Sequence, residues 1–296
     1  MSVSSMCRET KAAGEFSFSD NDFQMIADLA NERYGLYLQL SKKALVYSRL
    51  AKRLRALQLP NFETYCALLD GKEGDEEQVH LLSALTTNVT HFFREMHHFD
   101  YLGNTVATAL LARAREGHSV RIWSSACSAG QEAYSIAATL MTAVPDIARY
   151  DLKILATDID PKIIQTAKRG FYSADQLDAI PAQFRSRILT KTCGPTGDIE
   201  IHPDLRKMIS FGELNLIKDW PMRRRFDVIF CRNAAIYFDK RTQSRLWQRF
   251  ADHLIPGGHL MIGHSERLSG PAKECFKSVG ITTYAKIDTA NSNSNS

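Results

Sequence analysis

Two acidic side chains follow short apolar runs at points where the chain turns, and both could bind a cationic ligand. Glu132 comes after the run Val120–Ser124 (VRIWS) and a turn of small residues, and Asp158 ends the run Leu152–Asp158 (LKILATD). The carboxyl ends of parallel strands meet at one edge of a sheet, where an acid after the second strand commonly binds ribose hydroxyl groups. We therefore expect the two carboxylates to line one crevice.

The turn before Glu132 differs from a dinucleotide-binding fingerprint. That fingerprint is G-x-G-x-x-G, whereas the turn SSACSAG contains a single glycine, Gly130. Its small side chains still allow a ligand to approach the backbone, but an acid in the first turn of the next helix disfavours a phosphate. S-adenosylmethionine (AdoMet) carries a ribose, a sulfonium and an ammonium group without phosphate, so it suits these residues better.

A structural explanation of the same acids stays open at this point. Glu132 could simply stabilise the amino end of a helix that begins near Ala133. Asp158 and Asp160 could simply end a strand. The two acids by themselves therefore do not decide between a binding site and local structure.

Composition excludes several classes of protein. With 296 residues and 44% apolar content, the chain can form one large domain or two ordinary ones, and its net charge of +4 does not by itself indicate nucleic-acid binding. The six cysteines contain no C-x-x-C pair, and the nine histidines, including His91, His97 and His98, contain no H-E-x-x-H frame. We therefore expect reduced thiols and no metal.

The chain also lacks the patterns of export and membrane insertion. There is no amino-terminal apolar signal segment and no apolar stretch near about twenty residues, which a transmembrane helix requires. We expect a cytoplasmic protein. Residues 1–15 and 288–296 are polar and lack periodicity, so we expect both ends to be disordered.

The segment 16–90 has the spacing of a small helical domain. Ser19 can cap a first helix that Gly35 ends, and Ser41 can cap a second helix, Lys42–Leu57. Two further stretches show helical spacing: Phe62–Leu69 and Glu76–Leu85.

The segment 91–287 has a different rhythm. Short apolar runs alternate with helical stretches, which predicts an α/β domain with a parallel sheet covered on both faces. The runs are VRIWS, LKILATD, FDVIFC and HLMIGHS. Between about residues 170 and 210 the rhythm breaks, and Asp198–Ile201 alternates as a strand would, so we expect an inserted subdomain there.

The order of several longer motifs resembles one known family. The motifs are TTNVTHFFRE (Thr86–Glu95), WSSACSAGQEAYSIA (Trp123–Ala137), ATDID (Ala156–Asp160), GELNL (Gly212–Leu216), FDVIFCRNAAIYFD (Phe226–Asp239) and GHSE (Gly263–Glu266). In this order they resemble the CheR family of chemotaxis receptor methyltransferases, from about Phe18 to Lys286. The resemblance implies a Rossmann-like AdoMet-dependent methyltransferase domain, a helical N-terminal domain and a small inserted β-subdomain.

The resemblance also implies a function. Members of the family are AdoMet-dependent protein-glutamate O-methyltransferases that modify receptors in chemotaxis signal transduction. By matching position, it implies that the cofactor contacts Asn88, Thr90, Arg94, Ala126, Glu132, Asp158, Asn215, Leu216, Arg232 and Asn233. The chain departs from the usual family pattern at Gln131 and Ala133, where an acid and a proline are common, and at Ala234-Ala235, where larger residues are common.

Methylation of a carboxylate depends on positioning more than on a base. A glutamate side chain, with an unperturbed pKa of about 4.3, is already ionised at neutral pH. Following the resemblance, we expect Arg94 and Tyr237 to act at the methyl-transfer centre, with Asn233 in support, because a guanidinium and a phenol can both orient a carboxylate. The alternative is that Tyr237 and its aromatic neighbours only fill a core.

A basic helix offers a surface for a protein partner. Its cations are Lys42, Arg49, Lys52, Arg53 and Arg55. They could form a solvated face, bind phosphates, or, as the resemblance suggests, dock onto acidic helices in the cytoplasmic domains of receptors. The inserted segment could take up a receptor tail peptide. We expect neither nucleic acid nor membrane insertion.

Two other functions remain open on sequence grounds. An AdoMet-dependent methyltransferase could act on RNA or a small molecule, although no N-P-P-Y or D-P-P-Y block is present. A catalytically silent module could bind receptors without transferring a methyl group. The presence of Arg94, Asp158 and Tyr237 argues against the silent module.

Overall fold

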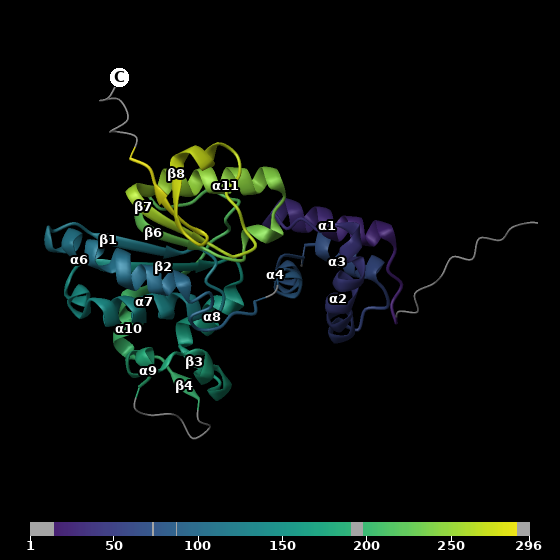
Figure 1. The fold of residues 1–296 in the computed structure, drawn as a ribbon. Helices are drawn as coiled ribbons and strands as arrows, with labels where there is room; N and C mark the ends of the chain where they lie inside the picture. Colours follow the sequence, from purple (N-terminus) through teal and green to yellow (C-terminus); the bar gives the residue numbers. More distant parts are fainter. Residues whose placement is uncertain (1–14, 73, 87, 191–197, 289–296) are drawn as a thin grey trace, which may run out of the picture. The chain divides into compact units, whose positions relative to one another are not determined.

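The chain folds into two compact units. The computed structural model describes residues 15–72, 74–86, 88–190 and 198–288 (Figure 1). One unit comprises Met1–Glu32 and Leu38–Thr86, and the other comprises Arg33–Tyr37 and Thr87–Ser296. Most residues of the two ends predicted to be disordered lie outside the described residues. Within the described ranges, every helix is too short or too polar to cross a membrane.

The first unit is helical. Its elements are α1 (Asp20–Tyr34), the 3₁₀ turn η1 (Leu40–Lys42), α2 (Lys43–Leu57), α3 (Phe62–Asp70) and α4 (Gly74–Leu85). Ser19 caps α1 as predicted, because its Oγ accepts from Asp22 N at 3.1 Å while Asp22 Oδ2 accepts from Ser19 N at 2.8 Å. Gly35, at a φ of 76°, follows the last residue of α1 as predicted.

The predicted start of the second helix is wrong. Ser41 lies within η1, and α2 begins at Lys43 with Lys42 at the N-cap and no side-chain cap hydrogen bond. The 3₁₀ turn comes first because Lys42 N donates to Gln39 O, which closes a tighter ring than an α-helical one.

The second unit contains the sheet. Its helices are α5 (His97–Tyr101), the π-helical turn η2 (Leu102–Val106), α6 (Ala107–Arg115), α7 (Gln131–Ala143), α8 (Pro161–Arg169), α9 (Ala182–Ile188), α10 (Pro203–Met208) and α11 (Lys240–His253). Its strands are β1 (Val120–Ser124), β2 (Leu152–Asp158), β3 (Phe171–Tyr172), β4 (Ile199–Glu200), β5 (Ile209–Glu213), β6 (Phe226–Cys231), β7 (Leu254–Ile262), β8 (Phe276–Gly280) and β9 (Thr283–Lys286). The 3₁₀ turns are η3 (Pro145–Arg149), η4 (Ala174–Ala179), η5 (Ala235–Tyr237) and η6 (Pro271–Cys275).

Seven strands form the main sheet, in the order β5-β2-β1-β6-β7-β9-β8. The pairs among β5, β2, β1, β6 and β7 are parallel, and β9 pairs antiparallel with its neighbours. The strand order reverses at β1, where β2 lies on one side and β6 on the other. This confirms the predicted α/β fold and puts a ligand crevice outside the carboxyl end of β1.

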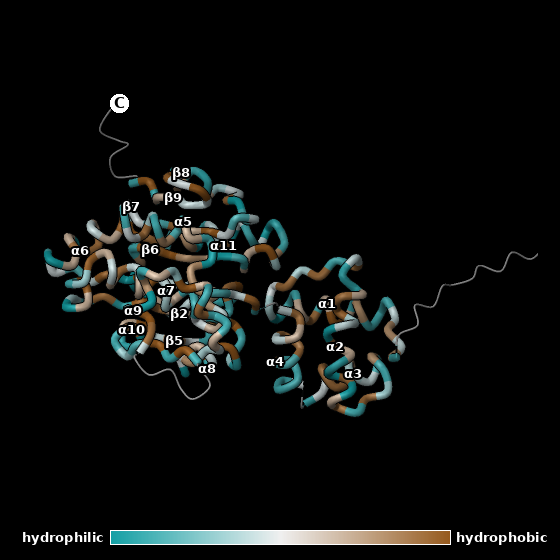
Figure 2. Tube along the Cα trace, turned by 60° about the horizontal axis from the view of Figure 1, so that its bottom comes forward, coloured by the Kyte–Doolittle hydropathy of each residue, from teal (hydrophilic) through white to brown (hydrophobic). Residues whose placement is uncertain are grey.

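Both faces of the sheet are buried. Ile122 and Phe230 belong to the core on the α7 side, whereas Trp123 and Ile229 belong to the core on the α11 side. Helices α7 and α11 lie on opposite sides of the sheet (Figure 1), and hydrophobic stretches run along the central strands (Figure 2). The side chains on both faces of these strands are therefore apolar, as in a parallel sheet that helices cover on both sides.

The segment predicted to be inserted contains a separate small sheet. Strands β3 and β4 pair antiparallel, with Phe171 opposite Glu200 and Tyr172 opposite Ile199. Leu189 bridges to Ile201, so β4 has neighbours on both sides and β3 lies at the edge in the described part of the segment. Residues 191–197 lie outside the described residues.

Candidate active site

The turn after β1 is tied to the strands on either side. Ser125 N donates to Phe230 O of β6 at 2.8 Å, and Cys127 N donates to Thr157 O of β2 at 2.9 Å. These bonds hold the turn at the carboxyl ends of β1, β2 and β6, where the strand order reverses.

Gly130 has a packing role in this turn. Its φ is 96°, and an added Cβ would lie 2.9 Å from the Ala167 Cβ and 3.1 Å from the Tyr172 hydroxyl. A side chain would therefore collide with α8 and β3. The single glycine of the motif is therefore required for a left-handed backbone and for close packing against α8 and β3.

Asp158 is held in a defined orientation. Its Oδ2 accepts from Ser128 N at 2.8 Å and its Oδ1 accepts from Asp160 N at 3.1 Å. Burial raises the pKa of the Asp158 carboxyl, and these two N–H donors oppose that rise. A carboxylate has about four lone-pair positions, so two remain to accept bonds from ligand hydroxyl groups.

Asn88 lies beside the same group of residues. Its Nδ2 donates to Asp160 Oδ2 at 3.2 Å, and its carbonyl oxygen accepts from the Ser128 hydroxyl at 3.0 Å. Asp160 also caps α8, since its Oδ1 accepts from Lys162 N at 2.9 Å. The structure thus brings together Asn88 and Asp158, which lie 70 positions apart in the sequence.

Glu132 and Arg232 form a second group. The Ser124 hydroxyl donates to Glu132 Oε1 at 2.6 Å, and Arg232 Nη1 lies 3.5 Å from Glu132 Oε2. Burial raises the pKa of the Glu132 carboxyl, while Arg232 and then Ser124 lower it. The Arg232 side chain is only 2% exposed, and its Nε and Nη1 find no hydrogen-bond partner among the described residues. A ligand carboxylate would supply the acceptor that these atoms lack.

The loop before α5 meets the other side of Arg232. Arg232 Nη2 donates to the carbonyl oxygen of Arg94 at 2.5 Å, and Arg232 Nε lies 3.8 Å from Glu95 Oε2. The Arg94 side chain turns back on its own loop, where Nη1 donates to Val89 O at 3.2 Å. Arg94 thus meets Arg232 through its backbone carbonyl, while its side-chain charge opposes the rise that burial causes in the pKa of the Glu132 carboxyl.

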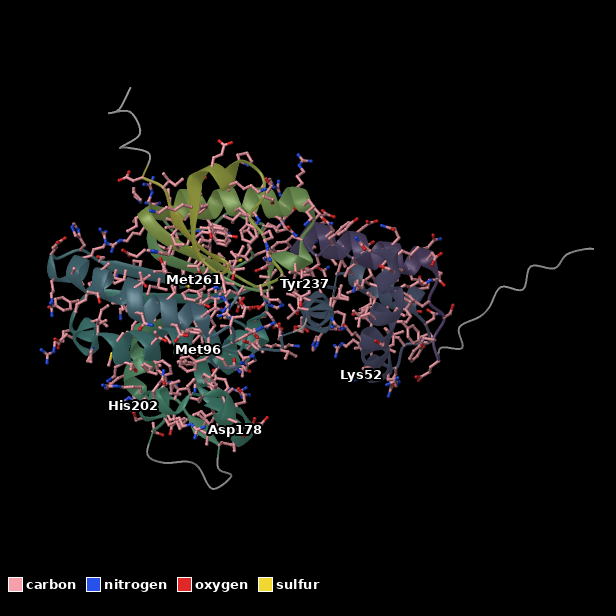
Figure 3. All side chains as sticks on the ribbon, viewed as in Figure 1. Lys52, Met96, Asp178, His202, Tyr237 and Met261 are labelled. Atoms are coloured by element: carbon pink, nitrogen blue, oxygen red, sulfur yellow. The ribbon has the colours of Figure 1, made fainter. Side chains whose placement is uncertain are left out.

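The turn that carries Asn233 and Tyr237 is held by Glu266. Glu266 Oε2 accepts from Asn233 N at 3.0 Å and Gly263 N at 2.6 Å, and its Oε1 accepts from Ala235 N at 2.7 Å. Burial raises the pKa of this carboxyl, and the backbone donors lower it. Asn233 has a φ of 57°, so its left-handed backbone is stabilised by the same acid. Tyr237 itself is half-buried in η5 (labelled in Figure 3).

The loop after β5 carries Asn215 and Leu216. Leu214 N donates to Asp158 O at 2.9 Å, which keeps this loop beside the end of β2. The Asn215 side chain donates to Arg33 O at 2.8 Å and accepts from Ile217 N at 3.0 Å. Arg249 Nη1 donates to Leu216 O at 2.7 Å, and its guanidinium lies 3.8 Å from the centre of the Trp220 ring. The side chain of Asn215 thus supports the loop, and Leu216 is buried.

The cations predicted to bind a partner differ in their contacts. Arg53 makes a bidentate pair with the buried Glu77, with Nε 2.8 Å from Oε1 and Nη2 2.6 Å from Oε2. Arg49 Nη1 donates to Leu85 O at 2.5 Å, at the end of α4. The remaining three are exposed: Lys42, Lys52 (Figure 3) and Arg55, which pairs with Glu15 at 2.9 Å.

The predicted cofactor residues gather at one edge of the second unit. Glu132, Asp158, Asn215, Arg232 and Asn233 all follow the carboxyl ends of parallel strands or lie in the first turn of the following helix. Ala126 lies in the turn after β1 and Thr90 in the loop before α5, and both are half-buried. The sequence analysis gave no role to Glu266 or Glu95. Both residues lie in motifs that carry the family resemblance, GHSE and TTNVTHFFRE, which was the available signal.

Comparison with known proteins identifies the family of the chain. Residues 88–285 match the family model of the CheR methyltransferase SAM-binding domain, and residues 21–86 match that of the CheR methyltransferase all-alpha domain. The chain is 49% identical to a probable chemotaxis protein methyltransferase of Rhizobium etli, which covers 84% of this chain and 94% of the relative. It is 41% identical to chemotaxis protein methyltransferase 2 of Pseudomonas aeruginosa (92% and 95%) and 39% identical to a chemotaxis protein methyltransferase of Salmonella typhimurium (91% and 91%). The chain therefore belongs to the CheR methyltransferase family.

Proposed function

We propose that the protein transfers a methyl group from AdoMet to glutamate carboxylates in the cytoplasmic domains of chemotaxis receptors and so forms methyl esters. The observation that carries the proposal is the pair of acids at one edge of the sheet, Glu132 with a side chain 12% exposed and the buried Asp158, beside the unsatisfied guanidinium of Arg232. Two acids and one cation complement a ligand with ribose hydroxyls, an ammonium group and a carboxylate.

Each part of the cofactor has a matching group in this chain. Asp158 would accept from the ribose hydroxyls, and Glu132 would accept from the ammonium group. Arg232 would donate to the carboxylate, together with Arg94 after a change of rotamer. Asn88 and Thr90 would border the cofactor from the loop before α5, Ala126 from the turn after β1, Asn233 from the turn after β6, and Asn215 and Leu216 beside the adenine. The bound cofactor supplies an electrophilic methyl group.

The chemistry then requires alignment. A carboxylate oxygen of the substrate bonds to the methyl carbon while the carbon–sulfur bond breaks and its electron pair stays on sulfur. The substrate glutamate needs no base, because its carboxyl, with an ordinary pKa of about 4.3, is ionised at neutral pH. Tyr237 and Arg94 would hold it within about 3 to 3.5 Å of the methyl carbon and exclude water.

The receptor would meet two surfaces. An acidic receptor helix fits the exposed cations Lys42, Lys52 and Arg55. None of these three forms a buried ion pair within the first unit, since the pair of Arg55 with Glu15 is exposed. Strand β3 offers an edge with Phe171 54% exposed, which fits an extended tail peptide. We propose that the enzyme works in the cytoplasm, where these receptor domains lie.

Incubation with isotope-labelled AdoMet and receptor cytoplasmic domains tests the proposal. We expect label on the receptor that is released by mild alkali, because methyl esters hydrolyse and methylated amines do not. Replacement of the receptor glutamates by glutamine should remove the label. Alkali-stable label, label on added RNA, or no label on receptor while AdoMet still binds would each contradict the proposal.

A further inference from the structure

Three side chains with metal-binding chemistry meet at the start of α5. Glu95, His97 and His98 each offer one ligand atom, and these atoms lie within 4.8 Å of one another. His98 is completely buried, the Glu95 side chain is 10% exposed, and His97 is half-buried. Met96, between them, marks the place in Figure 3. The methyl-transfer chemistry uses none of the three as a reacting group.

The polar atoms of this cluster are unsatisfied. Glu95 Oε2, His97 Nε2 and His98 Nδ1 are buried and find no hydrogen-bond partner among the described residues. His98 Nδ1 lies 3.6 Å from Glu95 Oε2, which is too long for a hydrogen bond. Each buried polar atom without a partner destabilises the fold, so three in one place require an explanation.

The opposite nitrogen of His98 is already engaged. His98 Nε2 lies 3.0 Å from Thr282 Oγ1. With the proton on Nε2, this bond fixes the ring and leaves the lone pair of Nδ1 directed at the Glu95 carboxylate. Two acceptors then face each other, and a cation between them would remove their repulsion. A histidine whose second nitrogen is held by an oxygen is the usual arrangement of a metal ligand.

We propose that Glu95, His97 and His98 form a binding site for a divalent transition-metal ion of the zinc type. Two imidazoles and one carboxylate are a frequent zinc donor set. His264 Nδ1 lies 3.0 Å from Glu95 Oε1 but does not belong to the group of three, so water would supply the fourth position. The sequence showed no metal motif because its spacing, E-x-H-H, is not one of the recognised frames.

Direct binding of Zn²⁺ to the full-length, chelator-treated protein tests the site. We expect one ion per chain by calorimetry, and a Co²⁺ visible spectrum with the intensity of a low-coordinate nitrogen and oxygen site. His97→Gln, which alters a half-buried ligand, should abolish this binding. Thr282→Val, which removes only the support of His98, should weaken it about tenfold.

The controls separate a metal site from a buried water. His91→Gln alters an exposed histidine in the same loop and should bind Zn²⁺ like the unaltered protein. Circular dichroism of each variant would show that the fold is kept. Equal Zn²⁺ affinity in His97→Gln and the unaltered protein, or no stoichiometric binding at all, would overturn the proposal and leave a bridging water as the occupant.

The site also has a consequence for the cofactor, which rests on the proposed function. Arg232 Nε lies 3.8 Å from the same Glu95 oxygen, so an ion on Glu95 would compete with Arg232 for it. Because Arg232 would then be released to bind the AdoMet carboxylate, we expect Zn²⁺ to raise AdoMet affinity and AdoMet to raise Zn²⁺ affinity by the same factor. AdoMet affinity that is identical with and without Zn²⁺ would overturn this coupling. Failure to bind AdoMet under any condition would count against the proposed function and not against the metal site.

Discussion

The crevice edge of the sheet and the basic helix α2 both contain charged residues that the sequence marked as functional, but the fold treats them differently. At the sheet edge, Glu132 and Arg232 come from distant parts of the chain and lie 3.5 Å apart, and Arg232 Nη1 is left without a hydrogen-bond partner among the described residues. On α2, Arg53 meets the buried Glu77 and Arg49 meets the end of α4. Both arginines are used within their own unit.

The two regions differ because the spacing of residues in the sequence predicts more about strand ends than about helix faces. Parallel strands necessarily bring their carboxyl ends together, so residues after them converge whatever their separation in sequence. Helical spacing reports only that residues share a face, and a face can be covered by another helix. Charge on a helix is therefore a weaker indicator of a binding surface than charge at a strand end.

The largest effect that would sharpen this comparison concerns Arg53. Arg53→Ala leaves Glu77, 5% exposed, with Tyr65 as its remaining partner in the cluster, and breaking a buried pair in this way costs about 3 to 5 kcal/mol. Amide hydrogen exchange in α2 and α4 of the full-length protein would measure the loss. Lys52→Ala should change the free energy of unfolding of this unit by less than about 0.5 kcal/mol. Similar protection in both variants would show that Arg53 is as free as Lys52.

The next effect concerns the proposed methyl-transfer centre. We expect Tyr237→Phe and Arg94→Ala to lower kcat by about a hundredfold through lost alignment, with a smaller change in AdoMet affinity. Steady-state kinetics with receptor, together with calorimetry for AdoMet, would separate the two quantities. Tyr284→Phe on β9 is the matched control. Unchanged kcat in both active-site variants would refute their assignment.

A smaller effect is expected at Asp158. Asp158→Asn keeps the shape but removes the charge that accepts from a ribose, so AdoMet affinity should fall about tenfold or more. Calorimetry measures this directly. Asp178→Asn, an exposed aspartate labelled in Figure 3, should leave the affinity unchanged. An unaltered dissociation constant for Asp158→Asn would remove this residue from the site.

The smallest effect should come from the exposed cation Lys52 of α2. Lys52→Glu should raise the KM for receptor about threefold and make it less sensitive to salt, because an exposed charge contributes little. The KM for receptor is measured by steady-state kinetics, and AdoMet affinity should stay unchanged. Lys277→Glu on β8 is the control for charge alone. If Lys52→Glu leaves the KM unchanged, α2 has a merely solvated face.

Much of the fold could be predicted from periodicity. The runs VRIWS, LKILATD and FDVIFC coincide with β1, β2 and β6 because an apolar stretch of this length is buried on both faces. The run HLMIGHS located only the second half of β7, which begins at Leu254. Between Leu254 and His259 the register with β6 shifts around Pro256 and two glycines, and such an irregularity interrupts the apolar pattern.

The site could be predicted in part. The positions of Glu132 and Asp158 follow from strand ends, whereas Glu266 could not be assigned, because its three backbone partners belong to the turn after β6 and to Gly263. Gly130 was recognised only as the single glycine of the turn, and its packing against Ala167 and Tyr172 could not be predicted from the sequence.

By itself, the sequence determined the elements, their order and therefore the edge where polar residues gather, because hydrophobic period and strand connection are local or topological properties. Only the tertiary structure decided which charges remain available to a ligand. That decision depends on partners far away in the chain: Glu77 occupies Arg53, Glu266 supports the Tyr237 turn, and Glu95 comes to lie beside two histidines and Arg232. A buried charge is stabilised or left unsatisfied by its neighbours in space, and no spacing rule contains them.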